Sequence, residues 1–246
     1  MVPVDVKRVM QAPGRVARYA ARRVLRPPVI THFGVRLALD ASVLSPAIVE
    51  SLYRGGYEGP EVEMIRATLR PEDRVLEIGG GLGFIGIITA RLVRLPQQVL
   101  IIEANPQLIP VMQRNFALNG VHPEVRNVVL GRDGASEVSF YLHDDFWASS
   151  LMPFAGGRET RVPQQDARQV LDAFRPTYLI VDIEGGEIAL LDDLDLAGVE
   201  TLCLEVHPGA TGQPAIDTMF AQFARQGFVL ERASRLENVV LFRRRR

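Results

Sequence analysis

Residues 75–83 read Val-Leu-Glu-Ile-Gly-Gly-Gly-Leu-Gly, an apolar helical segment follows at 84–93, and residues 99–106 read Val-Leu-Ile-Ile-Glu-Ala-Asn-Pro. The apolar runs predict two strands, and the glycines predict a tight turn where the backbone can approach a ligand. The second strand ends at Glu103, where an acidic side chain can accept hydrogen bonds from both hydroxyls of a ribose. The stretch therefore predicts a strand–helix–strand unit that binds a nucleoside.

The alternation of strand and helix continues to the end of the chain, which predicts an α/β fold with helices on both faces of a mostly parallel sheet. We expect strands at 74–78, 98–102, 125–130, 137–142, 177–182, 200–206, 228–233 and 237–243. We expect helices at 61–69, 84–94, 107–119, 166–173, 186–193 and 214–226. Before them we expect a basic helix at 5–25, a strand or hairpin at 35–39 and one more short helix.

The last two strands are joined by residues 234–237 alone, which indicates an antiparallel hairpin. A dinucleotide-binding dehydrogenase instead repeats its mononucleotide-binding half. The ending resembles that of the S-adenosylmethionine-dependent methyltransferases of class I. This resemblance implies a Rossmann-like, mostly parallel seven-stranded sheet with a C-terminal antiparallel hairpin.

Two classes of ligand fit the glycine turn. Residues 81–86 satisfy the Gly-x-Gly-x-x-Gly pattern of NAD-dependent enzymes, with Glu103 further along the chain. Residues 77–83, however, read Glu-x-Gly-x-Gly-x-Gly, and the carboxylate of Glu77 would repel a pyrophosphate at this turn. The same carboxylate could hold the ammonium group of S-adenosylmethionine through a water or a backbone amide. We therefore favour S-adenosylmethionine and keep an NAD-dependent oxidoreductase as the rival.

Other cofactor contacts are expected where neighbouring segments reach the same edge of the sheet. Tyr57 and Glu58 precede the core, where a lid could cover the cofactor or an aromatic turn could simply pack. In this fold the loop after the third strand flanks adenine, and Asp133 could assist there or belong to a turn. The predicted cofactor-binding residues are Tyr57, Glu58, Glu77, Gly79, Gly81, Gly83, Glu103, Ala104, Asn105, Leu130, Gly131 and Asp182.

A second group of polar residues follows two later strands. Asp182, Glu184 and Glu187 come after the strand at 177–182, and Glu205 and His207 share a face at the end of the next strand. Histidine can take a proton near neutral pH, so the predicted catalytic residues are His207 as base with Asp182 or Glu205 orienting it. Glu187 serves equally well as a helix cap. Asp182, Glu184, Glu205 and His207 could also hold a divalent metal, but no tight ligand spacing supports this, and we rank it second.

A long loop between strands follows the strand expected at 137–142, and long loops in compact domains are often lids or binding loops. It carries Phe146, Trp147 and residues 149–152. An exposed tryptophan there suggests substrate contact, whereas the alternative is that it packs the loop onto the sheet. The predicted substrate-binding residues are Trp147, Ser149, Ser150 and Glu184.

Composition and charge exclude several classes of protein. The chain has 246 residues, 47% hydrophobic content, a net charge of −1 and one cysteine, Cys203, in an apolar run that predicts burial. It shows no membrane-spanning run or secretory signal, so we expect a cytoplasmic protein that binds no nucleic acid. We divide it into a basic helical extension or lid at 1–60 and a cofactor-binding domain at 61–246. The basic N-terminus could touch a membrane surface weakly, and the terminal arginines are expected to fray.

Taken together, these motifs resemble the FkbM family of methyltransferases over about residues 50–243. The resemblance rests on Gly-Tyr-Glu at 56–58, the glycine turn at 77–83, Glu-Ala-Asn-Pro at 103–106, Ser-Ser-Leu at 149–151, Asp-Ile-Glu-Gly-Gly-Glu at 182–187 and Glu-Val-His-Pro at 205–208. It implies methyl transfer from S-adenosylmethionine, usually to a hydroxyl of a natural product, sugar or glycolipid. Ile180 stands where family members often carry lysine, so an acceptor-binding role cannot be assigned there.

Three functions therefore remain open at this point. The favoured one is an O-methyltransferase acting on a small-molecule or sugar- or lipid-linked acceptor. The second is an NAD-dependent oxidoreductase, and the third is a non-catalytic family member that binds the cofactor.

Overall fold

The computed structural model describes residues 13–40, 42–236 and 238–245. The N-terminal elements are α1 (Pro13–Leu25), β1 (Val29–His32), β2 (Val35–Ala38), α2 (Pro46–Arg54) and α3 (Gly59–Thr68). The first half of the core comprises β3 (Val75–Ile78), α4 (Phe84–Leu92), η1 (Pro96–Gln98), β4 (Val99–Ile102), α5 (Leu108–Asn119) and β5 (Glu124–Arg126). A small sheet contains β6 (Val129–Gly131), β7 (Glu137–Leu142) and β8 (Arg158–Asp166), with η2 (Phe146–Ala148) between the last two. The second half comprises α6 (Ala167–Phe174), β9 (Tyr178–Val181), α7 (Glu187–Leu191), β10 (Thr201–Glu205), α8 (Pro208–Thr211), α9 (Gln213–Arg225), β11 (Phe228–Ala233) and β12 (Val239–Arg244).

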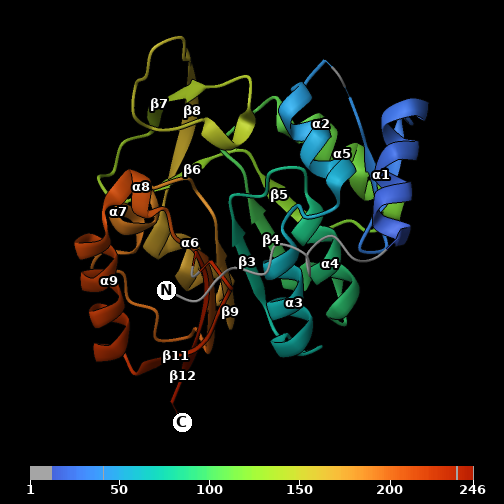
Figure 1. The fold of residues 1–246 in the computed structure, drawn as a ribbon. Coiled ribbons are helices and arrows are strands. Elements are labelled where there is room, and N and C mark those ends of the chain that lie inside the picture. Colours follow the sequence, from blue (N-terminus) through green and yellow to red (C-terminus); the bar gives the residue numbers. More distant parts are fainter. Residues whose placement is uncertain (1–12, 41, 237, 246) are drawn as a thin grey trace, which may run out of the picture.

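The central sheet has seven strands in the order β11-β12-β10-β9-β3-β4-β5, which confirms the expected α/β fold (Figure 1). β3 lies between β4 and β9 and is parallel to both. β12 inserts between β10 and β11 and is antiparallel to both, so it forms the expected C-terminal hairpin with β11. The ends of β3, β9 and β10 consequently meet at one edge of the sheet, as the sequence predicts for the site.

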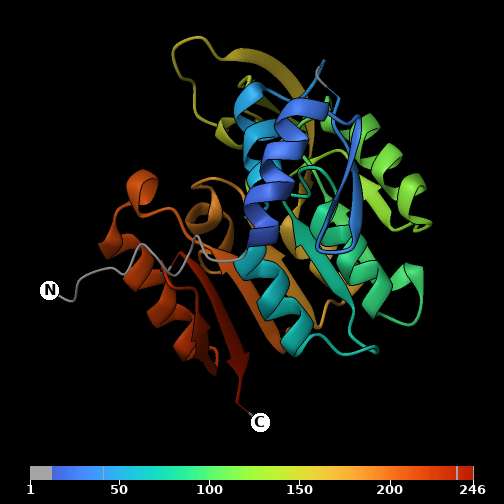
Figure 2. The same cartoon turned by 45° about the vertical axis from the view of Figure 1, so that its right-hand side comes forward.

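Helices cover both faces of this sheet, because alternate strand residues are apolar on each side (Figures 1 and 2). One hydrophobic cluster joins α3, α4 and α5 to one face, and a second joins α6, α7 and α9 to the other. In β3 the alternation is direct, since Val75 belongs to the first cluster and Leu76 to the second. The sheet is therefore the middle layer of three.

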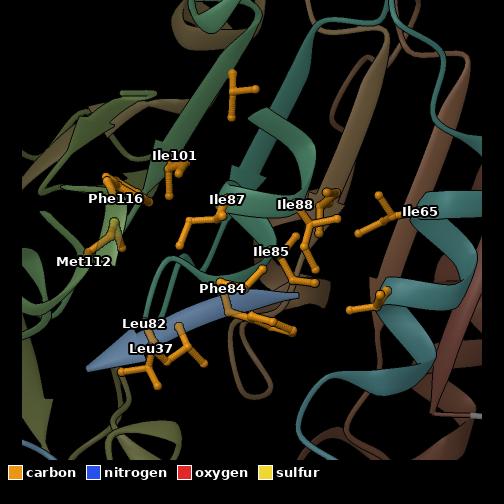
Figure 3. Packing of buried hydrophobic residues seen from close by; sticks show 14 of the residues in the cluster. Leu37, Ile65, Leu82, Phe84, Ile85, Ile87, Ile88, Ile101, Met112 and Phe116 are labelled. Carbon is orange, nitrogen blue, oxygen red and sulfur yellow. The ribbon is translucent and has the colours of Figure 1, made fainter. Parts of the chain in front are cut away.

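The β1–β2 hairpin adds to the first layer rather than standing apart from it. Leu37 of β2 is fully buried and lies below α4 beside Leu82 and Phe84 (Figure 3). Helix α1 lies along α2, where the Arg22 guanidinium donates to the carbonyls of Leu52 and Tyr53. The division at residue 60 and the movement of this segment as a lid stay predictions.

Two expectations about the middle of the chain are wrong. The strand expected at 125–130 is split: β5 pairs with β4, whereas β6 turns away and pairs with β8 in the small sheet. Asn127 lies at the bend and donates to the carbonyls of Glu103 and Ala104. The expected long loop contains β8, which reads Arg-Glu-Thr-Arg-Val-Pro-Gln-Gln-Asp and has too few apolar residues to reveal a strand.

The first segment is described only in part, and the last segment differs from expectation. The helix expected at 5–25 is described from residue 13 onward, and its beginning lies outside the described residues. Arg243 and Arg244 are not frayed: Arg243 pairs with Glu231 at 2.7 Å, and the Arg244 guanidinium donates to the Val199 carbonyl at 2.8 Å. Cys203 is buried, as predicted. Within the described part of the chain, no helix has both the length and the apolar character needed to cross a bilayer.

Candidate functional site

A cavity of about 1320 Å³ opens at the edge where β3, β4, β9 and β10 end. Ligand cavities usually measure about 300–1,000 Å³, so this one has room for a nucleoside cofactor and an acceptor together. The predicted site residues that line it are Tyr57, Glu58, Gly79, Gly81, Glu103, Ala104, Asn105, Leu130, Gly131, Trp147, Ser149, Ser150, Asp182, Glu184 and Glu205. Glu77, Gly83 and His207 are not among the lining residues.

The glycine turn fits closely against the end of β9. Gly79 has φ of +94°, and a Cβ placed on it would lie 1.7 Å from the backbone oxygen of Asp182. Gly81 has φ of +52°, and a Cβ there would come within 3.5 Å of the Tyr57 hydroxyl. Both lining glycines are therefore required by backbone geometry, and the turn passes directly beside the acidic residues that follow β9.

Gly83 faces α5 instead of the cavity. A Cβ on this residue would lie 2.6 Å from Met112 and 2.7 Å from Phe116. The absence of a side chain on Gly83 lets α4 begin close to α5, so this glycine is required for packing, and its predicted cofactor contact stays a prediction.

Glu103 has the geometry expected of a ribose-binding carboxylate. It is 6% exposed, and its two oxygens accept hydrogen bonds from the backbone amides of Gly81 at 2.7 Å and Asn105 at 2.6 Å. Burial raises its pKa to about 7 in spite of these hydrogen bonds. Because each carboxylate oxygen can accept a second hydrogen bond, the fixed side chain can still receive ribose hydroxyls. This part of the cavity therefore fits a nucleoside.

Glu77 lies behind the turn, on the side of β3 that faces α4. It is 2% exposed, and its Oε2 has no hydrogen-bond partner among the described residues. Burial and the nearby charge of Glu103 raise its pKa well above the usual range. Glu77 is not among the lining residues, and its predicted contact with the cofactor through a water or a backbone amide stays a prediction.

Tyr57 and Glu58 form part of the cavity wall next to the glycine turn. Glu58 adopts a left-handed backbone with φ of +47°, and it precedes α3. Burial and the charge of Glu61 raise the pKa of Glu58 well above its ordinary value. Glu61 is a lining residue that the sequence analysis missed, because it sits inside an ordinary helical pattern.

His207 is held by carboxylates on both ring nitrogens. Its Nδ1 lies 2.9 Å from Glu187 Oε1, and its Nε2 lies 3.2 Å from Glu184 Oε2 and 4.0 Å from Asp182 Oδ1. Glu187 is 1% exposed and also accepts a hydrogen bond from the Gly185 amide. The turn at 183–186 thus brings three acidic residues around one imidazole.

The carboxylates change the proton affinity of this histidine. Burial alone would lower the pKa of His207, but the hydrogen bond and charge of Glu187 and the charges of Glu184 and Asp182 raise it to about 9. Burial raises the pKa of Glu184 to about 7, against the attraction of His207. Burial would raise the pKa of Glu187, but hydrogen bonds from His207 and from backbone amides, together with the charge of His207, outweigh it and lower the pKa.

Glu187, rather than Glu205 or Asp182, is therefore the residue that orients His207. From the sequence, Glu187 was equally well explained as a helix cap and as a functional residue. The sequence does not show how close the start of α7 comes to the end of β10. Glu205 accepts a hydrogen bond from Asn238 Nδ2 at 2.7 Å, and Asn238 lines the cavity without having been predicted. Its segment, the turn between β11 and β12, carries no motif that would reveal a site.

The ranked metal alternative has partial geometric support. One potential ligand atom from each of Asp182, Glu205 and His207 lies within 4.8 Å of the other two. Of the described residues, Asp182 Oδ1 is one of the buried side-chain atoms without a hydrogen-bond partner. Two carboxylates and an imidazole suit a divalent cation, so this set fits one chemically.

The loop after β7 provides an aromatic and apolar wall. Phe146 and Trp147 lie in η2, with ring centroids 5.9 Å apart, and both line the cavity. The Ser149 hydroxyl accepts a hydrogen bond from the His143 amide, and the Ser150 hydroxyl accepts one from the Met152 amide. The serines therefore shape the loop, whereas the exposed side chains of Leu151 and Met152 provide apolar surface at the cavity.

Comparison with known proteins identifies one family. The family model described as the methyltransferase FkbM domain matches residues 89–230, which is more than half of the chain. The match includes β4, the acidic residues after β9, and His207, but begins after the glycine turn. No curated protein sequence matches the chain significantly.

Solved structures with similar backbones are distant in sequence. Magnesium protoporphyrin IX methyltransferase from Synechocystis PCC 6803 is 15% identical, with a TM-score of 0.49, over 82% of this chain and 85% of that one. Ribosomal protein L11 methylase from Lactobacillus delbrueckii subsp. bulgaricus is 15% identical, with a TM-score of 0.45, over 78% and 82% of the two chains. Precorrin-6y C5,15-methyltransferase from Geobacter metallireducens GS-15 is 12% identical, with a TM-score of 0.46, over 84% and 91%.

Proposed function

The chain belongs to the FkbM family of methyltransferases, and from this premise we propose that it transfers a methyl group from S-adenosylmethionine to a hydroxyl oxygen of its acceptor. The observation that carries the proposal is the position of His207. Its Nε2 lies 4.0 Å from Asp182 Oδ1, and the backbone of Asp182 lies directly against Gly79 of the glycine turn. The deprotonated form of His207 would thus accept a proton close to the place where a nucleoside cofactor would fit.

Residues of the glycine turn and the end of β4 would hold the cofactor. Glu103 would accept the ribose hydroxyls, and the absence of a side chain on Gly81 would let the cofactor approach the backbone between the Tyr57 hydroxyl and the glycine turn. When bound, S-adenosylmethionine supplies an electrophilic methyl group on a positively charged sulfur. The carboxylates of Asp182 and Glu184 at this edge favour such a cation electrostatically.

His207 would take the proton of the acceptor hydroxyl while the oxygen forms its bond to the methyl carbon. Glu187 fixes the ring through Nδ1, which leaves Nε2 directed toward Glu184 and Asp182. The acceptor hydroxyl must replace Glu184 as the partner of Nε2. Positioning of the two reactants supplies much of the rate acceleration, and the proton transfer adds roughly 10²–10⁴-fold.

An acceptor with an apolar portion fits the opposite wall of the cavity. Phe146 and Trp147 would contact that portion, and Leu151 and Met152 would extend the contact outward. Sugars and lipid-linked molecules combine an apolar surface with a reactive hydroxyl, so they are the first acceptors to screen. We also propose that the other predicted cofactor-binding residues that line the cavity contact S-adenosylmethionine directly.

The test separates cofactor binding from proton transfer. S-adenosylhomocysteine binding is measured by calorimetry, with NAD as the comparison, and turnover is measured as S-adenosylhomocysteine release across a panel of hydroxylated acceptors. We expect Glu103→Ala to lose binding, and His207→Ala to keep binding but lose at least about 100-fold in turnover. His122→Ala, an exposed histidine elsewhere, is the control and should change neither.

Each other outcome points to a different function. Binding of NAD alone would contradict the methyltransferase assignment. Binding without turnover on any acceptor would favour a non-catalytic member. Turnover that a chelator abolishes would replace the base with the metal alternative, in which His207 is a ligand, whereas turnover that His207→Ala leaves unchanged would contradict both roles of this histidine.

A further inference from the structure

A second cavity, of about 920 Å³, adjoins the cofactor cavity and has a strongly basic lining. Three separate parts of the fold supply its charges: α1, the end of α2, and β11 with the turn that follows it. The arginines that line it are Arg15, Arg18, Arg22, Arg54, Arg232 and Arg235, and among the residues that the structure describes the only acidic one in this lining is Glu63. Such an arrangement favours an anion.

The charges of this cavity are only partly neutralised. Arg54 pairs with Glu50 at 3.1 Å, and Arg232 lies 3.8 Å from Glu231. Arg22 is occupied by backbone carbonyls, because it donates to Leu52, Tyr53 and Thr31.

Three other arginines keep their charge available for a ligand. Arg15 donates to the Gly55 carbonyl and Arg18 to the Gly14 carbonyl, so each is hydrogen-bonded but not neutralised. Within residues 13–40, 42–236 and 238–245, neither of them, nor Arg235, forms an ion pair with an acidic side chain. Guanidinium groups bind phosphate oxygens in a bidentate manner, so this set suits a phosphate group.

Two segments separate the arginine cavity from the cofactor cavity and line both of them: the segment that contains residues 56 and 60, and the turn between β11 and β12. Gly56 and Pro60 line both of them. The turn between β11 and β12 presents Ser234 to the arginine cavity and Asn238 to the cofactor cavity.

This turn leads to the side of the cofactor cavity where the acceptor is expected. The side chains of Ser234 and Asn238 are hydrogen-bonded at 3.0 Å, and Asn238 donates to Glu205 at 2.7 Å. A molecule that crosses this turn would therefore reach the acidic residues around His207.

We propose that the arginine cavity binds a phosphate-bearing part of the methyl acceptor, while the hydroxyl of the same acceptor lies at His207. The position of the hydroxyl at His207 rests on the proposed function. The anion site itself depends only on the arginines. The phosphate could belong to a soluble nucleotide-linked molecule or to a lipid headgroup, which share this chemistry.

The experiment measures pyrophosphate binding to the full chain by calorimetry at low salt. The variant is Arg18→Glu with Arg235→Glu, because both side chains are exposed and neither holds another element in place. Arg168→Glu, an exposed arginine on α6 against the other face of the sheet, is the control for charge reversal. S-adenosylhomocysteine binding is measured alongside as an independent readout of the cofactor cavity.

We expect pyrophosphate to bind the wild type and Arg168→Glu alike, and the double variant to bind at least about tenfold more weakly because two favourable charges become repulsive. S-adenosylhomocysteine should bind all three proteins equally. Uridine diphosphate and vesicles containing phosphatidic acid then distinguish the two sources of phosphate, and binding of either supports the proposal.

Absence of pyrophosphate binding, or equal binding by the double variant, would overturn the inference. Tighter binding of an RNA duplex than of pyrophosphate and uridine diphosphate, lost in the double variant, would also overturn it in favour of a nucleic-acid surface. Failure of S-adenosylhomocysteine binding with intact pyrophosphate binding would instead contradict the proposed function and leave the anion site standing.

Discussion

At the scale of single residues, the site depends on how Glu187 and His207 meet. Neither residue is unusual in its own segment: Glu187 begins α7, and His207 follows β10. The distance of 2.9 Å between Glu187 Oε1 and His207 Nδ1 makes them one unit. A buried carboxylate on one ring nitrogen sets the orientation and the proton affinity of the other, which is how many enzymes prepare a histidine base.

This pair predicts the pH dependence of turnover. With the pKa of His207 raised to about 9, the free enzyme holds the imidazole protonated at neutral pH, and only the deprotonated form can act as base. We therefore expect kcat/KM to rise with pH, about tenfold for each pH unit, until it levels near pH 9.

Glu187→Gln removes the charge that raises this pKa. The rising part of the profile should consequently move to lower pH, while the plateau falls because the ring is oriented less firmly. Glu72→Gln, an exposed change, is the control. A Glu187→Gln profile that keeps the wild-type midpoint would show that another group carries the titration.

At the scale of elements, buried polar side chains fasten the N-terminal hairpin to the glycine turn. Asn115 of α5 is fully buried; it accepts a hydrogen bond from the Ala38 amide of β2 and donates to the carbonyl of Leu82. One side chain thus connects the hairpin, α5 and the turn that faces the cofactor cavity. Hydrophobic periodicity could predict α5 but could not show what its one fully buried asparagine touches.

Replacement of this asparagine should therefore cost much stability. Asn115→Ala leaves a buried amide and a buried carbonyl without partners, so we expect the free energy of unfolding to fall by about 2–4 kcal/mol. Asn119→Ala is the matched control: it lies one turn further along α5, makes similar hydrogen bonds to Arg36, and is partly exposed. Urea denaturation of both variants would test this, and equal losses would contradict it.

At the scale of the whole molecule, a buried ion network joins the start of β3 to the start of β9. Asp73 is 2% exposed and accepts hydrogen bonds from the Arg70 guanidinium at 2.7 Å and from the Thr177 hydroxyl at 2.9 Å. Burial alone would raise the pKa of Asp73, but these donors outweigh it and lower the pKa below its usual value. The network lies at the edge of the sheet opposite the site.

Because the pKa of Asp73 is lower in the folded state than in the unfolded state, the free energy of unfolding depends on pH in the acidic range. The stabilisation is complete above the ordinary pKa of aspartate, about 4, and is lost as pH falls through the lower value in the folded protein. Asp73→Asn should lower the free energy of unfolding by about 1–3 kcal/mol at pH 7, and its difference from wild type should shrink in acid. Asp172→Asn, exposed on α6, is the control, and a difference that stays constant from pH 7 to acid would refute the argument.

The sequence by itself determined the layered fold and the edge of the sheet where the site lies. Apolar periodicity and glycine position are local signals, and the carboxyl ends of parallel strands must meet, so Glu103, Asp182 and His207 could be assigned to one edge. The tertiary structure alone decided which side chains touch: that Glu187 holds His207, that Gly83 serves packing, and that Glu77 lies behind the turn.

Contacts between distant segments also explain why the sequence did not reveal certain elements. β8 is stabilised by its partners β6 and β7 and not by its own pattern of residues, and the arginine cavity brings together side chains from α1 and from the turn before β12. Contacts between segments far apart in the chain depend on packing geometry, which no local pattern encodes.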